Sequence, residues 1–411
     1  MRKTTLIIFF CLLFFHSGAQ NLSFSDSASI SIITCSPGQE VYAKFGHSGI
    51  RVSDPVNNKD LIFNYGIFSF DTENFYYKFI KGETDYFLGV HPTDFFLPEY
   101  KNRNSMVWEQ VLNLTVTEKR RIINALLENY KPENRMYRYN FVFDNCATRP
   151  RDKVLNSIDG HVMFHNTSEA KTFRQWVGVY VGNDSWVKFG IDLVFGMDAD
   201  KSVSQYESMF LPEVLMNEFQ MAQVVNMSTK ETRNLVASKN VLVNVETEQL
   251  EEGSWMTKPL AIFLVVMLVV VLLSAFEINN KHYYKILDST LLMVTGITGI
   301  IVFYLMFVSS HPLVKYNLNI LWLNPLNVVA AILIWSKRFR IPMFIYQIVN
   351  IGLLILALIA FALSFQNFNV ASFPLIVMIL VRYSSWVVRT KHKLDRKSKF
   401  VIKNNITESS K

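Results

Sequence analysis

The chain has few cysteines, only three in 411 residues. Cys11 lies in an apolar run with no small residues before it, so we do not expect a lipoprotein-type lipidation site there. Cys35 and Cys146 have no second Cys or His nearby at ligand spacing, which argues against a zinc site. We therefore expect no metal and no other cofactor. If the chain is exported, a disulfide between these two cysteines is the simple alternative.

Long uncharged runs are missing between residues 20 and 258 and frequent after Lys258. This contrast predicts two environments for one chain, water and a lipid bilayer. The net charge of +7 lies largely in the tail and in short loops between the apolar runs. Membrane topology explains that placement more simply than nucleic acid binding.

The N-terminus has the three parts of a secretory signal peptide. Basic residues Arg2 and Lys3 precede an apolar run at residues 6–15, and small residues end at Ala19. The mature chain is therefore expected to begin at Gln20. An uncleaved anchor is the less favoured alternative, because ten apolar residues are short of the roughly 20 that span a bilayer.

Five apolar runs in the second half have about the length of membrane helices. They cover residues 260–276, 291–308, 320–335, 343–365 and 373–388. The third run is the weakest because Asn324-Pro325 interrupts it. Export of the first half places the end of the fifth run in the cytoplasm. The loops expected inside then carry the basic residues Lys281, Lys285, Lys337, Arg338 and Arg340, whereas the outside loops carry only Lys315.

These signals divide the chain into five parts. They are a signal peptide (1–19), a periplasmic domain (20–245), a linker (246–258), a transmembrane helical domain (259–390) and a basic cytoplasmic tail (391–411). In the periplasmic domain, strands are expected at residues 29–33, 48–53 and 60–68, the last two as a hairpin. Helices are expected at 116–129 and 147–157, whereas residues 173–225 have a mixed pattern. The fold class is α+β followed by an all-α membrane part.

Cys146 is the residue most suited to covalent chemistry. It follows Asp144 and Asn145 at the expected start of a helix, where free N–H groups and the helix dipole favour the thiolate. Arg149 and Arg151 favour the same form. Cys35 lies in a Ser-Pro-Gly turn without such a field, so we expect it to be structural.

A nucleophilic thiol needs a base, and His47 is the strongest candidate. It lies between Gly46 and Ser48 at the start of an expected strand, where the backbone can approach a ligand closely. A third polar group should orient the imidazole. The next strand of the hairpin offers Asn64 and Tyr65, with Asp60 at its start, and the sequence does not choose among them.

A histidine on a hairpin strand followed by a cysteine at a helix start resembles the circularly permuted papain-like (NlpC-type) fold, also seen in lecithin:retinol acyltransferase-like enzymes. The whole chain is similar to the Bacteroidota lipoprotein N-acyltransferase family, which has a periplasmic domain before a multi-span membrane part. The motifs that carry this resemblance are Phe45-Gly46-His47-Ser48, Phe63-Asn64-Tyr65-Gly66, Asp144-Asn145-Cys146-Ala147-Thr148-Arg149 and Met209-Phe210-Leu211-Pro212.

The resemblance implies acyl transfer through Cys146 and His47, from a phospholipid to the α-amine of a diacylated lipoprotein. Asn145 and the backbone N–H of Cys146 are candidates for stabilising the oxyanion. The candidates for substrate binding are Ser48, Tyr139, Arg149, Arg151 and His311. Two alternatives remain, a membrane-anchored cysteine peptidase or amidase acting on cell-wall peptides, and a non-catalytic sensor or scaffold.

Overall fold

One antiparallel sheet of seven strands organises the exported half of the chain. The computed structural model describes residues 22–165, 170–245, 254–280 and 283–409. The sheet has the order β10-β5-β1-β2-β3-β4-β6. Its strands are β1 (Ser29–Cys35), β2 (His47–Asp54), β3 (Lys59–Ile67), β4 (Asp85–Pro92), β5 (Val107–Leu112), β6 (Met136–Arg138) and β10 (Val236–Val243). The three strands predicted from the sequence are confirmed as the adjacent strands β1, β2 and β3.

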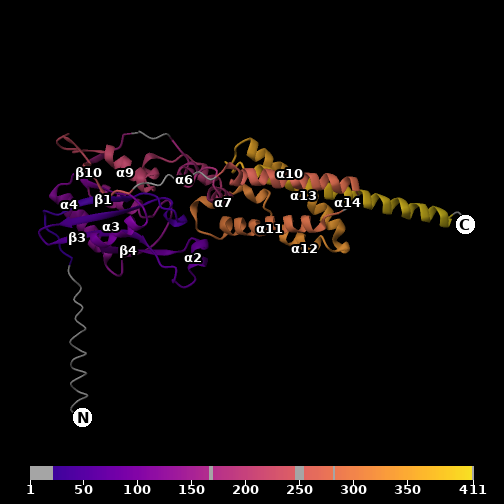
Figure 1. The fold of residues 1–411 in the computed structure, drawn as a ribbon, viewed down its shortest axis with the longest axis horizontal. Coiled ribbons are helices and arrows are strands. Elements are labelled where there is room, and N and C mark those ends of the chain that lie inside the picture. Colours follow the sequence, from indigo (N-terminus) through magenta and orange to yellow (C-terminus); the bar gives the residue numbers. More distant parts are fainter. Residues whose placement is uncertain (1–21, 166–169, 246–253, 281–282, 410–411) are drawn as a thin grey trace, which may run out of the picture.

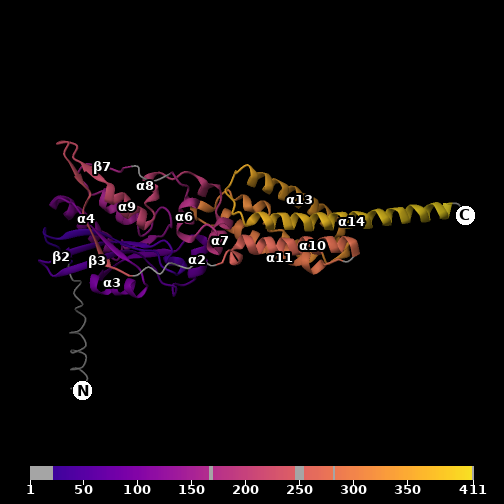
Figure 2. The same cartoon turned by 45° about the horizontal axis from the view of Figure 1, so that its top comes forward.

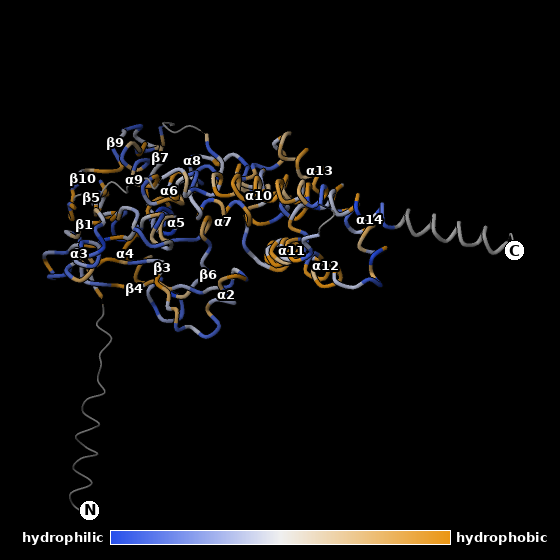
Figure 3. Tube along the Cα trace, turned by 45° about the vertical axis from the view of Figure 1, so that its right-hand side comes forward, coloured by the Kyte–Doolittle hydropathy of each residue, from blue (hydrophilic) through white to orange (hydrophobic). Residues whose placement is uncertain are grey.

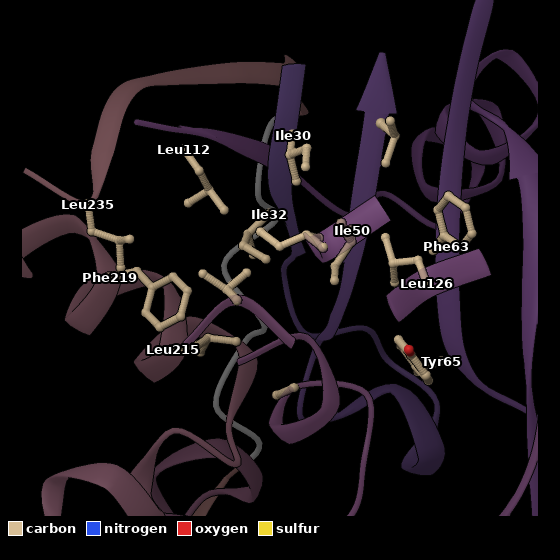
Figure 4. Close-up of a cluster of buried hydrophobic side chains, with 14 of the residues drawn as sticks. Ile30, Ile32, Ile50, Phe63, Tyr65, Leu112, Leu126, Leu215, Phe219 and Leu235 are labelled. Atoms are coloured by element: carbon tan, nitrogen blue, oxygen red, sulfur yellow. The ribbon is translucent and has the colours of Figure 1, made fainter. Parts of the chain in front are cut away.

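Alternation of side chains along the central strands builds two separate cores. Ile30, Ile32, Ile50, Phe63 and Tyr65 point to one face, where they are almost fully buried (Figure 4). Three helices pack on that face, namely α4 (Val116–Tyr130), α5 (Thr148–Leu155) and α9 (Pro212–Met221). The predicted helix at 116–129 is confirmed as α4, which begins with a capping box between Thr115 and Glu118.

The opposite face of the sheet carries a smaller core beneath α3 (Thr93–Asn102). Ile33, Cys35 and Ile62 contact Phe96 and Tyr100 of this helix there. His47 and Asn64 share this face of the sheet, because His47 pairs with Cys35 and Asn64 pairs with Gly49. The central hairpin therefore places His47 and Asn64, with Ile62, on the side of α3, and Ile50, Phe63 and Tyr65 under α4, α5 and α9.

The region with the mixed sequence pattern forms short helices and a second, three-stranded sheet. The helices are α6 (Phe173–Val181), α7 (Trp186–Val194) and α8 (Gln205–Ser208), and the strands are β7 (His161–Met163), β8 (Gln223–Val225) and β9 (Thr232–Asn234). Helix α7 lies where the exported half meets the helical bundle (Figures 1 and 2).

The second half of the chain is a bundle of long apolar helices (Figure 3). Among the described residues, four helical segments have the length and composition of membrane spans. They are α10 (Pro259–Asn280), α11 (Lys285–Phe307), the segment Lys337–Ala362 that contains α13 (Arg340–Ala362), and the segment Ser372–Lys393 of α14 (Ser372–Ser409). The predicted all-α membrane part is confirmed.

The third apolar run does not form the continuous helix that we expected. It contains a short 3₁₀ turn at Leu318–Leu321 and the seven-residue helix α12 (Asn327–Leu333). Between these two helical pieces stands Pro325, which lacks an N–H and restricts the residue before it. A local turn, with Asn324 Oδ1 accepting from Leu326 N at 3.0 Å, replaces helical bonds there.

This broken run still follows α11 along its length. Gly299 lies against Leu323, Gly296 against Val328, and Ser289 accepts a hydrogen bond from the indole of Trp335. The contact partners on α11 move back toward its N-terminus as the run proceeds, so the two segments are antiparallel. The run therefore passes from the end of the bundle next to α7 to the opposite end.

Buried charges and amides join α7 to the bundle. Asp192 binds Lys188 at 2.5 Å and Arg174 at 2.9 Å, and its second oxygen accepts from Asn369 at 2.9 Å. Asp200 pairs with Arg174 at 2.7 Å and accepts from the amide of Asn367 at 3.1 Å. Two bundle asparagines, Asn317 and Asn319, donate to the carbonyl of Leu193. These groups form the junction network, which fixes the exported half to the bundle.

Three predicted segments lie partly or wholly outside the described residues. The signal peptide (1–19) lies outside them, as does 246–253 of the linker. Residues 255–257 of that linker form a 3₁₀ turn. Helix α14 continues through the predicted basic tail to Ser409, and residues 410–411 lie outside the described residues.

Candidate active site

His47 stands at the start of β2, immediately after a turn that only glycine suits. Gly46 has φ +74°, and a Cβ at this position would lie 2.6 Å from the carbonyl oxygen of Cys35. The turn therefore brings the chain close against β1 just before the histidine. The imidazole stacks on the ring of Tyr100, with 6.2 Å between the centroids and an interplanar angle of 15°.

Asn64 on β3 holds the imidazole from one side. Its Oδ1 lies 2.6 Å from Nε2 of His47. Because Nε2 is engaged there, Nδ1 is the nitrogen left for the hydrogen bond between His47 and Cys146. The structure thus brings His47, Asn64 and Cys146 together.

The other candidates for orienting His47 have different partners. Tyr65 follows Asn64 on the strand, so its side chain points into the core under α4, where its hydroxyl donates to Asn129 at 2.8 Å. Asp60 pairs with Arg51 and accepts from Thr93. Strand alternation therefore selects Asn64 over Tyr65.

Cys146 approaches the hairpin from the start of α5. Strand β3 has a bulge between Asn64 and Ile67, and within it Gly66 adopts φ +90°. A Cβ at Gly66 would lie 3.5 Å from Cβ of Cys146. The backbone N–H groups of Ser48 and of Cys146 itself lie near the sulfur and favour its charged form.

These neighbours shift the ionisation of both groups toward an ion pair. Burial of the thiol opposes its ionisation, but the charge of His47, the hydrogen bond to its ring and the two N–H groups together hold the pKa of Cys146 below its ordinary value. Burial also disfavours the charged imidazole, yet the pKa of His47 is raised by Cys146, by Asn64 and by Glu99. The arrangement can hold a thiolate beside an imidazolium, the reactive form of a thiol nucleophile.

Asn145, a candidate for the oxyanion site, has a structural task instead. Its Oδ1 accepts from the N–H groups of Ala147 and Thr148 at 2.8 and 2.9 Å. Its amide nitrogen donates to the carbonyls of Phe141 and Phe210 at 2.7 and 2.9 Å. Both amide hydrogens are used in this way, so the side chain fixes the turn before Cys146 and has no donor left for an oxyanion.

The two arginines after Cys146 also have partners within the chain. Arg149 binds both oxygens of Asp144, at 2.5 and 2.8 Å, and lies 3.5 Å from the ring centroid of Tyr137. Arg151 is buried and donates to Asp152 and to the carbonyl of Tyr206. Both candidates for substrate binding are thus engaged within the chain, Arg149 with a carboxylate and Arg151 with groups that include the carbonyl of Tyr206 on α8.

Tyr139, a predicted candidate for substrate binding, forms a wall next to the thiol together with Tyr86. Tyr139 stacks on Tyr86 with 4.2 Å between the ring centroids. Burial, together with the charge of Cys146, raises the pKa of Tyr86 to about 12. The same two causes raise the pKa of Tyr139. Tyr139 therefore lies near Cys146, its role in substrate binding stays a prediction, and Tyr86 and Tyr100 are neighbours that only the fold reveals.

The remaining candidates lie at different distances from this centre. The side chain of Ser48 is fully buried, and it is the backbone N–H of Ser48 that reaches the sulfur. His311 belongs to the bundle and binds the carbonyl of Phe79, at 2.8 Å, on α2 (Phe75–Lys81). Cys35 and Cys146 are both free thiols. Among the described residues, no three His, Cys, Asp or Glu side chains are grouped as metal ligands would be.

Two family models match successive parts of this chain. The Lnb N-terminal periplasmic domain matches residues 20–178, and the Lnb transmembrane domain matches residues 251–394. The chain therefore belongs to the Lnb lipoprotein N-acyltransferase family, and it is a multi-pass inner-membrane protein with a periplasmic domain. No curated protein and no solved structure matches it. The predicted family and fold class are confirmed.

Proposed function

We propose that this protein transfers an acyl chain from a phospholipid to the α-amine of a diacylglyceryl-cysteine lipoprotein, through a thioester on Cys146. The observation that carries the proposal is the hydrogen-bonded series Cys146, His47 and Asn64 in a chain of this family. A thiol enzyme fixed to a membrane bundle has both lipid substrates within reach. A thioester also divides one difficult transfer into two easier steps.

In the first step, the thiolate of Cys146 attacks the ester carbonyl of the phospholipid. The tetrahedral intermediate collapses, the bond from the carbonyl carbon to the glycerol oxygen breaks, and His47 gives its proton to that oxygen. A lysophospholipid leaves and the acyl chain remains on sulfur. The backbone N–H groups of Ser48 and Cys146 are the donors nearest the reacting atoms and would stabilise the oxyanion.

In the second step, the neutral α-amine of the lipoprotein attacks the thioester carbonyl. His47 accepts a proton from the attacking nitrogen, the carbon–sulfur bond breaks, and an amide forms. Sulfur leaves as the thiolate, so the ion pair with His47 is restored. Asn64 keeps Nδ1 of the ring directed at the sulfur in both steps through its contact with Nε2.

The proposal includes the topology of the membrane part. The four long helices and the broken run between α11 and α13 make five passes, which puts the end of α14 in the cytoplasm. A green fluorescent protein fused after Lys411 should therefore fluoresce, because it folds in the cytoplasm but not after export through the general secretion route. A dark fusion combined with an active periplasmic alkaline phosphatase fusion at the same point would contradict this topology.

Expression in cells that lack their own N-acyltransferase tests the activity. We expect mass spectrometry of a reporter lipoprotein to detect a third acyl chain, in amide linkage, with the wild-type protein. Cys146→Ala and His47→Ala should abolish it. Cys35→Ala is the matched control, since it removes the other thiol of the expected mature chain and should retain transfer.

Three outcomes would each contradict a different part of the proposal. A membrane-inserted wild-type protein that adds no acyl chain would rule out the transferase. Transfer that survives Cys146→Ala would rule out the thioester. Release of cell-wall peptides without acylation, dependent on Cys146, would favour the membrane-anchored peptidase or amidase.

A further inference from the structure

A cavity of about 600 Å³ lies where the exported half meets α11. Its walls are almost entirely apolar, and they come from α2, the turn before Cys146, the end of α7, the outer end of α11 and the loop after it. Representative lining residues are Ile80, Phe141, Phe195, Ile301, Leu305 and Leu313. A volume of this size is typical of small-molecule sites.

One wall of the cavity belongs to a membrane helix. Ile300 and Ile301, on the outer part of α11, line the cavity and each remain 48% exposed. Aliphatic side chains that are exposed on a spanning helix face the hydrocarbon of the bilayer. The cavity therefore adjoins the acyl region of the outer leaflet.

Helix α2 covers this part of the junction and has the composition of a membrane interface. Its side chains Tyr76, Tyr77 and Phe79 are 72%, 59% and 50% exposed, and lysines 78 and 81 stand among them. Aromatic rings with lysines are typical of the lipid headgroup level. The loop after α11 is fixed to α2, since the hydroxyl of Ser310 donates to the carbonyls of Lys81 and Gly82, each at 2.9 Å.

The inner wall of the cavity is shared with the turn that carries the nucleophile. Phe141 lines the cavity, and its carbonyl accepts the hydrogen bond from Asn145, the residue before Cys146. The ring of Phe141 also contacts Phe45, two residues before His47, with 4.7 Å between the centroids. The cavity therefore reaches from the bilayer side to the residues that support both Cys146 and His47.

We propose that this cavity binds the hydrocarbon chain of the acyl donor, a membrane phospholipid, and so delivers its ester to Cys146. The proposal rests on the acyltransferase function argued above and adds the place where the donor chain lies. Apolar walls recognise a chain by area alone, so the length of the cavity should set the length of the chain transferred.

Photo-crosslinking tests the binding without needing turnover. Cys146→Ala protein is placed in nanodiscs that contain a phosphatidylethanolamine with a diazirine at the end of one acyl chain. We expect the label on peptides that contain Phe141, Leu305 or Leu313, above the level on the remaining lipid-facing surface. Even labelling of all lipid-facing helices would overturn the proposal.

A pair of variants one helical turn apart tests the same cavity during turnover. Ile301→Trp fills part of the cavity, so we expect transfer of 16-carbon chains to fall by at least about tenfold while shorter chains are retained. Ile297→Trp is the matched control, because Ile297 is 50% exposed on the same helix but does not line the cavity, and it should leave transfer unchanged. Equal effects of the two variants would contradict the assignment.

The two proposals fail in distinguishable ways. If wild-type protein transfers acyl chains but the probe does not label the cavity, only the cavity assignment is wrong. If the probe labels the cavity but wild-type protein acylates no lipoprotein, the lipid site stands and the transferase function is wrong.

Discussion

The reactivity of Cys146 depends on a balance between burial and charge. Removing a thiol from water favours its neutral form, but a nearby imidazolium and two N–H donors favour the thiolate. His47 responds in the opposite sense, since the thiolate beside it raises the pKa of its ring. Each group thus stabilises the charged form of the other, and the pair exists between the lowered thiol pKa and the raised imidazole pKa.

The lowered pKa of Cys146 predicts reactivity that persists at acidic pH. The thiolate is present above the lowered pKa of Cys146 and is lost only as pH falls through it, so alkylation by iodoacetamide should remain fast at pH values where an ordinary thiol is protonated. In His47→Ala, burial still raises the pKa of Cys146, but the positive charge of His47 no longer lowers it. The pH midpoint of alkylation should therefore rise. Mass spectrometry of the alkylated peptide across a pH series measures both midpoints.

The alkylation series is measured in a Cys35→Ala background, so that Cys146 is the thiol that reacts. Cys35 is fully buried next to Tyr100.

The pH profile of acyl transfer should fall on its alkaline side, whereas that of alkylation should not. Above the raised pKa of His47 the ring has no proton for the leaving oxygen, so transfer should decline there while alkylation continues. An unchanged midpoint in His47→Ala would refute the ion pair.

Asn64 is predicted to act as a positioning residue. Asn64→Ala removes the 2.6 Å contact with Nε2 and frees the ring to rotate, so we expect kcat to fall by about 10- to 100-fold with little change in KM. Asn64→Asp keeps an acceptor at the same place and should restore part of the rate. A loss confined to KM in Asn64→Ala would indicate a substrate contact instead.

The sequence was sufficient to single out Cys146 and His47, which the fold brings together, because a helix start and a glycine-flanked strand start are local signals. The choice of Asn64 over Tyr65 depended on which face of β3 points toward α3, a question of tertiary structure. The partners of Arg149 and Arg151 could not be predicted for a related reason. A charge looks free in a sequence until the fold supplies its partner, here Asp144 for one and Asp152 with Tyr206 for the other.

At the scale of elements, two glycines of helix α11 let the interrupted segment at 320–335 pack closely against it. A Cβ at Gly296 would lie 2.4 Å from the backbone nitrogen of Val328, and one at Gly299 would lie 2.2 Å from the carbonyl oxygen of Leu323. Small residues of this kind let two backbones approach within a membrane, where packing holds helices together. The irregular backbone before α12 is thereby buried against protein, as membrane structures require.

This close packing makes the α11 glycines intolerant of substitution. Gly299→Ala places a methyl group in contact with backbone that cannot withdraw like a side chain, so we expect a loss of about 1–3 kcal/mol. Gly352→Ala on α13 is the matched control, since no atom beyond the nearby backbone of its own helix lies within 4 Å of the added carbon, and its stability should change by less than about 0.5 kcal/mol. Thermal unfolding in detergent measures the difference, and equal unfolding temperatures would contradict the packing.

Some of the secondary-structure elements could be predicted from the sequence pattern, and others could not. Strands β1 to β3 and helix α4 carry strong periodicity and a capping box, and their positions were predicted closely. The run at 320–335 has the hydropathy of a span, but its shape depends on Pro325 and on the contacts that α11 offers. Helices α6 to α9 are short and meet several neighbours, so no single apolar period describes them.

At the scale of the whole molecule, the junction network holds two halves of different solubility in one arrangement. Arg174, Lys188 and Asp192 are each almost fully buried, and their charges satisfy one another. Removing Asp192 takes away the carboxylate partner of the buried Lys188 and one of the two carboxylate partners of Arg174, and breaking a buried pair in this way typically costs about 3–5 kcal/mol.

Asp192→Ala should therefore loosen the exported half from the bundle. We expect faster cleavage of the 246–258 linker by added protease and a fall in acyl transfer, with alkylation of Cys146 retained because the thiol and His47 are remote from the change. Asp184→Ala is the matched control: Asp184 is 72% exposed and pairs weakly with Lys258 at 3.4 Å, so its loss should be nearly silent. Loss of alkylation in Asp192→Ala would mean that the variant unfolds the exported half instead.

The two amide contacts to Leu193 have a consequence for the order of assembly. Leu193 lies in the last turn of α7, and the partners of its carbonyl, Asn317 and Asn319, are synthesised more than 120 residues later. Asp200 and Asp192 likewise accept hydrogen bonds from Asn367 and Asn369, which lie in the loop before α14 and are synthesised later still. When the exported half leaves the translocation channel, the polar groups of its junction with the bundle therefore still lack these partners. The last membrane segments supply them, so the junction is complete only when the ribosome has nearly finished the chain.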